Sequence, residues 1–136
     1  MLEKALALLG IAQKGGNIAL GDEPVGAAAH GGKARLIILA SDAAGHTQRR
    51  AGSYGAVHGT PVISIDADKS TLGAVFGRTS VAMTALTDIQ LARRFLEELD
   101  PPERYAETLE AVTKKAEVMA RRKKEQQRRN RARGKR

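Results

Sequence analysis

The sequence lacks cysteine, and its other shortages exclude several kinds of protein. Without cysteine there is neither a disulfide framework nor a thiolate metal site, which is typical of a reducing compartment. No apolar run approaches the length that spans a membrane. Met1–Lys4 has no signal-peptide layout, because its apolar residues are periodic and an acid stands at the front. We therefore expect a cytoplasmic protein with no membrane partner.

Aromatic residues and catalytic motifs are also scarce. Two tyrosines, two phenylalanines and no tryptophan are too few for base stacking to be the main mode of binding nucleic acid. His30, His46 and His58 do not have the spacing of metal ligands, so no metal site is expected. Ser41 and Asp42 have no nucleophile-elbow motif around them, and P-loop and G-x-G-x-x-G spellings are absent. The sequence therefore predicts no enzyme, no catalytic residue and no cofactor.

Positive charge is concentrated in the last quarter of the chain. Residues 1–100 carry ten Lys or Arg and ten Asp or Glu, whereas residues 101–136 carry thirteen Lys or Arg and five Glu, a net of 13 − 5 = +8. Such asymmetry indicates a polyanionic partner, most often nucleic acid. The basic tail consists of Arg121, Arg122, Lys123, Lys124, Arg128, Arg129, Arg131 and Arg133, with Lys135 and Arg136 after them. It can bind RNA without reading its sequence.

Hydrophobic patterns alternate between strand and helix over the first hundred residues. Leu36–Ala40 is a continuous apolar run and reads as a central strand. Further strands are expected at 17–20, 60–65 and 81–86, and helices at 2–13, 22–30, 47–57, 69–75 and 87–99. Asp22, the segment Asp66-Ala67-Asp68 and Thr87 are the expected helix caps. The pattern predicts an α/β fold: a three-layer α/β/α sandwich on a small mixed four-stranded sheet.

Asp100-Pro101-Pro102 marks the expected domain boundary. It separates residues 1–100, the α/β/α domain, from residues 101–136, a basic extension that is helical or disordered. Tyr105, Leu109, Val112, Ala116 and Met119 form one narrow apolar stripe on a helix. This stripe could dock on a partner protein or on a second copy of the chain.

Polar residues beside the predicted strands form the candidate site. In α/β sheets the working groups lie just past the carboxyl ends of strands, which points to Ser41-Asp42. Lys14, Lys33 and Arg35 flank the neighbouring turns, and the helix start at Gly21 could hold a phosphate. Lys14, Gly21, Asp22, Glu23, Lys33 and Asp42 are expected to lie on one rim.

Three motifs occur in an order that resembles a known family. Ala12–Ile18, then Gly21–Val25, and then Gly32-Lys33-Ala34-Arg35 with the apolar strand ending in Ser41-Asp42 resemble the L-seven-Ae/L-thirty-e ribosomal protein superfamily, in its bacterial ribosomal-protein-like branch. Thr60-Pro61-Val62 and residues 72–88 continue the match, so the resemblance covers about residues 1–99. Members are small α/β/α RNA binders, and many recognise the kink-turn.

The resemblance implies which residues would contact RNA. The family's RNA-contacting turn usually reads Gly-x-Asn-Glu with a Lys three residues later; Gly21 matches, while Glu23, Pro24 and Ala27 replace the other three. A second RNA-facing loop corresponds to residues 77–81, with Arg78 and Ser80. The expected function is non-enzymatic binding of structured RNA, ribosomal or kink-turn-like, in a ribonucleoprotein. The alternatives are the protein-interaction module described above and a small-molecule or nucleotide-binding domain that uses the Gly21 turn.

Overall fold

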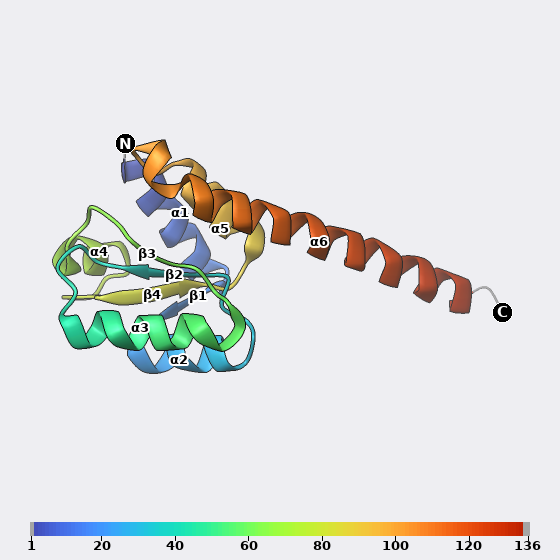
Figure 1. Cartoon of the computed structure of the whole chain (residues 1–136), viewed down its shortest axis with the longest axis horizontal. Coiled ribbons are helices and arrows are strands. Elements are labelled where there is room, and N and C mark those ends of the chain that lie inside the picture. Colours follow the sequence, from blue (N-terminus) through green and yellow to red (C-terminus); the bar gives the residue numbers. More distant parts are fainter. Residues whose placement is uncertain (1, 135–136) are drawn as a thin grey trace.

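The computed structural model describes residues 2–134. Its sheet contains four short strands, and six helices surround or extend from it (Figure 1). The elements in chain order are α1 (Leu2–Lys14), β1 (Ile18–Leu20), α2 (Asp22–His30), β2 (Leu36–Leu39), α3 (Gly45–His58), β3 (Val62–Ser64), α4 (Lys69–Val75), β4 (Met83–Leu86), α5 (Ile89–Glu97) and α6 (Pro102–Gly134).

The sheet is mixed, and its strand order is β1-β4-β2-β3. β4 runs antiparallel to both of its neighbours, β1 and β2, while β2 and β3 are parallel. β1, β2 and β3 therefore all run in one direction. Their carboxyl ends meet at one edge of the sheet together with the start of β4, and their amino ends meet at the opposite edge together with the end of β4.

β2 is the centre of the molecule, because all four of its side chains are buried and they alternate between two cores. Leu36 and Ile38 join a core covered by α1, α4, α5 and the first half of α6. Ile37 and Leu39 join a second core covered by α2 and α3. Two helical layers on the two faces of one sheet confirm the predicted α/β/α sandwich.

The helix caps differ in part from those predicted. The segment Asp66-Ala67-Asp68 caps α4 as expected, and the capping residue is Asp68, whose carboxylate accepts from the Thr71 N–H at 2.7 Å. The prediction of Thr87 as the cap of α5 is wrong: the Asp88 carboxylate accepts from the N–H groups of Gln90 and Leu91. The Thr87 N–H instead donates to Asn17 O at 3.0 Å, and this hydrogen bond extends the β1–β4 pairing by one residue.

α6 starts immediately after the expected boundary, and its first half belongs to the body. Tyr105, Val112 and Ala116 are buried in the core shared with α1 and α5, and Leu109 and Met119 pack against that core. The apolar stripe of this helix is thus occupied inside the chain. The extension of residues 101–136 is helical through Gly134.

Candidate functional site

The carboxyl-end edge of the sheet brings together most of the predicted site. We call it the Gly21 edge; it consists of residues 21–23, 41–42, 66–68 and 77–81. The Gly21 N–H donates to Met83 O at 2.9 Å, and the Ala40 N–H donates to Ala82 O at 3.0 Å. Gly21 has φ +90°, a conformation that glycine adopts without strain, so the chain can turn sharply from β1 into α2.

Asp22 does not cap α2, and this prediction is wrong. Gly21 is the N-cap residue, and no side chain caps this end of the helix. The Asp22 carboxylate instead accepts from the Tyr54 hydroxyl and pairs with Arg50 at 3.1 Å. The hydrogen bond to Asp22, followed by burial, raises the pKa of Tyr54. Asp22 therefore joins α2 to α3, and its carboxylate is already paired within the chain.

Asp42 also makes a contact within the chain. Its Oδ1 accepts from the Lys69 N–H at 2.8 Å, which connects the end of β2 to the first residue of α4. The Ser41 N–H donates to Ala67 O at 2.8 Å beside it. Both side chains are exposed. This corner is thus held by hydrogen bonds between the segments that follow β2 and β3.

The loop of residues 77–81 rests on α4. The Arg78 N–H donates to Gly73 O at 2.9 Å, and the Val81 N–H donates to Lys69 O at 3.0 Å. A Cβ atom at Gly73 would lie 2.8 Å from both Arg78 O and Ser80 N. Arg78 and Ser80 are exposed on the outer side of this loop. The absence of a side chain at Gly73 therefore sets where both residues stand.

We expect Gly73→Ala to displace the loop and to cost about 1–3 kcal/mol of unfolding free energy, because the clash is with backbone atoms. Thermal unfolding and the amide NMR shifts of residues 77–81 measure the two effects. Gly52→Ala in α3 is the matched control, since a Cβ there meets nothing within 4 Å; it should stabilise the helix by up to about 1 kcal/mol. Unchanged loop shifts in Gly73→Ala would contradict this account.

Lys14 and Lys33 lie at the opposite edge of the sheet. Lys14 ends α1 just before β1, and Lys33 stands between α2 and β2. The Arg35 N–H donates to Leu86 O at 2.7 Å, so these residues face the end of β4. We call this the Lys14 edge: Lys14, Lys33, Arg35 and the β4–α5 junction at 87–88. The expected single rim of six residues is thus divided between two edges.

The two edges differ in charge. The Gly21 edge carries five carboxylates and one cation, Arg78. Two of the carboxylates, Asp22 and Asp66, pair with arginines from outside the edge. The five are Asp22, Glu23, Asp42, Asp66 and Asp68. The Lys14 edge carries three cations and one acid, Asp88, which is engaged as the cap of α5. The Nε atom of Arg35, one of these three cations, is buried and has no hydrogen-bond partner in the described part of the chain. The Lys14 edge is the more attractive one for a polyanion.

The distal half of α6 carries the strongest charge on the molecule. Residues 121–134, which we call the arm, are all exposed, and eight of them are Lys or Arg. The arm leaves the body beside the start of α5, where a cavity of about 470 Å³ is lined by residues 88–90 and by Ala116, Met119, Ala120 and Lys123 of α6. Figure 1 shows it extending away on the side where α3 ends, opposite to α4. The arm therefore leaves from the Lys14 edge.

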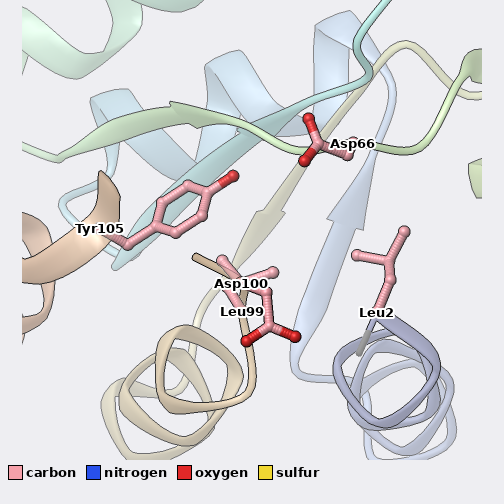
Figure 2. Close-up of a pocket in the computed structure, with 5 residues that line it drawn as sticks. All are labelled: Leu2, Asp66, Leu99, Asp100 and Tyr105. Atoms are coloured by element: carbon pink, nitrogen blue, oxygen red, sulfur yellow. The ribbon is translucent and has the colours of Figure 1, made fainter. Parts of the chain in front are cut away.

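A second cavity lies where α6 begins. It has a volume of about 210 Å³. Figure 2 shows the residues that line it, Leu2, Asp66, Leu99, Asp100 and Tyr105. The Tyr105 hydroxyl donates to Ser64 O at 3.0 Å, and Arg104 pairs with Asp66 at 2.9 Å. Burial raises the pKa of Tyr105. These contacts fasten α6 to the end of β3, and sequence periodicity could not reveal them because they join residues about forty positions apart.

Metal sites and membrane-spanning helices are both absent from residues 2–134. Within that range, no group of three or more His, Asp or Glu side chains could hold a metal ion. No helix in the same range is long and apolar enough to cross a membrane.

Comparison with known proteins bears on the fold. No protein-family model matches the chain, and no curated protein matches it. Among solved structures, the chain is similar to a protein of unknown function from Bacillus halodurans, with 28% sequence identity and a TM-score of 0.63. The match covers 68% of this chain and 92% of that one. Nearly all of that protein thus has a counterpart in this chain, while about a third of this chain lies outside the match.

Proposed function

We propose that this protein is a non-enzymatic, cytoplasmic RNA-binding protein that holds structured RNA, such as ribosomal RNA, through its basic arm. The observation that carries the proposal is the charge of the arm: eight Lys or Arg among residues 121–134, all exposed. A polyanion releases condensed counterions when such cations neutralise its phosphates, which favours binding of RNA or DNA without base contacts. The resemblance to a family of RNA binders favours RNA.

The body supplies two further contacts in this proposal. Lys14, Lys33 and Arg35 stand at the edge from which the arm leaves, so they extend its positive surface onto the sheet. At the other edge, loop 77–81 with Arg78 and Ser80 would select among RNAs, together with the turn at Gly21. An RNA that contacts both edges must pass along the body.

The two alternatives have less support. The stripe from Tyr105 to Met119 packs on the body core, so a protein partner would have to displace it. A nucleotide at the Gly21 turn would find few donors, because the Gly21 N–H is given to Met83 O and Pro24 has no N–H. Neither objection applies to the arm.

A binding titration of the full chain tests the proposal. Three RNAs are compared at two salt concentrations: a kink-turn, the same RNA with its G·A pairs replaced by Watson–Crick pairs, and a plain duplex. If half of the arm's eight described cations contact phosphates, the logarithm of the binding constant should fall with a slope of about −4 against the logarithm of salt concentration.

The outcomes are separable. A steep slope for all three RNAs supports the arm, and a preference for the kink-turn assigns selection to the Gly21 edge. Absence of binding at low salt would overturn the proposed function. Retention of a nucleotide by the purified protein, with no RNA bound, would favour the small-molecule alternative.

A further inference from the structure

Seven of the eight cations of the arm form two rows along the helix. At 3.6 residues per turn, Arg121, Lys124, Arg128 and Arg131 follow spacings of three, four and three residues and lie on one side. Arg122, Arg129 and Arg133 form the second row. Glu125 and Ala132 lie between the two rows. The far side of the helix carries the eighth cation, Lys123, together with Gln126, Gln127 and Asn130.

We propose that the arm binds double-helical RNA as a continuous helix, inserted into a groove so that its two rows contact phosphates on the two strands. This inference rests on the RNA binding proposed above and names the form of RNA and the form of the arm. Two rows of cations on either side of a narrow strip without cations match two phosphate backbones on either side of a groove. Glu125 then faces the base edges, where a carboxylate can accept from a cytosine amino group.

The dimensions of the arm restrict the kind of duplex. An α-helix with its side chains is about 10–12 Å wide, and fourteen residues span about 20 Å. The major groove of regular A-form RNA is deep and narrow, so a helix of that width does not enter it. A bulge or internal loop interrupts the regular helix and opens the groove. We therefore expect an RNA duplex with such an interruption.

The helical form of the arm depends on neutralisation of its charge. Lys124 and Arg128, and Arg129 and Arg133, are like-charged pairs four residues apart, which destabilise a helix. On the far side of the helix, Gln126 donates to Asn130 Oδ1 at 3.2 Å. The exposed arm has no tertiary packing to offset the repulsion. Phosphates placed against the two rows would remove it, so helicity and RNA binding should increase together.

The test separates helix from charge. Gln127→Pro removes a backbone donor and clashes with the carbonyl four residues earlier, so it breaks the helix while every cation remains. Gln127→Ala is the matched control, because Gln127 is exposed outside the two rows of cations and alanine favours helix. Both variants are made in the full chain. Each is titrated with an internally bulged RNA duplex of about 20 base pairs, with the uninterrupted duplex, and with one of its single strands.

We expect Gln127→Pro to bind the bulged duplex at least tenfold more weakly than Gln127→Ala does, with single-strand affinity equal within twofold. Circular dichroism should show a gain of helix on RNA addition in the alanine variant and a smaller one in the proline variant. Equal binding of the bulged duplex by both variants would overturn the helical mode, as would equal binding of bulged and uninterrupted duplexes by the control. If the unmodified chain binds none of these RNAs, the proposed function itself has failed.

Discussion

Removal of residues 121–136 should weaken binding of structured RNA about a thousandfold at about 0.1 M salt. Each phosphate contact contributes about 0.9 to the slope of the logarithm of the binding constant against the logarithm of salt concentration. For four contacts, lowering the salt from about 1 M to about 0.1 M therefore raises the binding constant by between three and four orders of magnitude. The slope itself should become shallower than about −4 and approach the value set by the body, where Lys14, Lys33 and Arg35 remain. Titration at several salt concentrations measures both quantities.

The cut after Ala120 is chosen from the packing of α6. Truncation at Asp100 would remove Tyr105, Val112 and Ala116 from the core and expose α5. Residues 121–134 are exposed throughout, so their loss should leave the midpoint of thermal unfolding unchanged within about 1 °C, because exposed positions contribute little to stability. An unchanged salt slope in the truncated chain would contradict the role assigned to the arm.

The alternating pattern of the sequence was sufficient to predict the layers of the fold. The segment from Leu36 to Leu39 is apolar at every position, and this pattern is typical of a strand that is covered on both faces. The strand order β1-β4-β2-β3 was not predictable in this way, because it depends on pairings between residues distant in sequence, such as Ile18 with Leu86. Caps were ambiguous for a local reason: Thr87 and Asp88 are adjacent, and both residue types can cap a helix.

The division of the candidate site has a simple geometric cause. Lys14 precedes β1 and Gly21 follows it, so a strand of three residues, about 10 Å long, stands between them. Lys33 and Asp42 flank β2 in the same manner. Residues that flank one strand lie at opposite edges of a sheet, and this signal was present in the sequence. The pairing of Asp22 with Tyr54 was not, because it joins residues 32 positions apart.

The spacing of the stripe on α6 predicted that this face of the helix is buried, but it did not identify the surface that covers it. Heptad-like positions are buried equally well by a second chain, by a different protein or by the same chain. The structure packs the stripe against α5, in a core that α1 shares. The consequence is that a polar group in the stripe should cost stability of the monomer.

Val112→Asp should lower the unfolding free energy by at least about 3 kcal/mol, equivalent to a fall of about 10 °C in the thermal midpoint. Val112 is 2% exposed in the core between α5 and α6, so the substitution buries a carboxylate without a partner. The helix should separate from α5, and hydrogen exchange of amides in both helices should accelerate. Thermal unfolding and exchange are both measured on the full chain.

Ala111→Asp is the matched control, since Ala111 precedes Val112 on the same helix and is exposed. It should cost less than about 1 kcal/mol, which is the difference in helix propensity between alanine and aspartate. Intramolecular packing requires the loss in Val112→Asp to be independent of protein concentration. A loss that appears only at high concentration, together with a fall in molecular mass, would instead show that the stripe joins two copies of the chain.

Because the arm continues directly from this stripe, separation of α6 from α5 would also release the arm from the Lys14 edge. RNA affinity should therefore fall together with stability in Val112→Asp but not in Ala111→Asp.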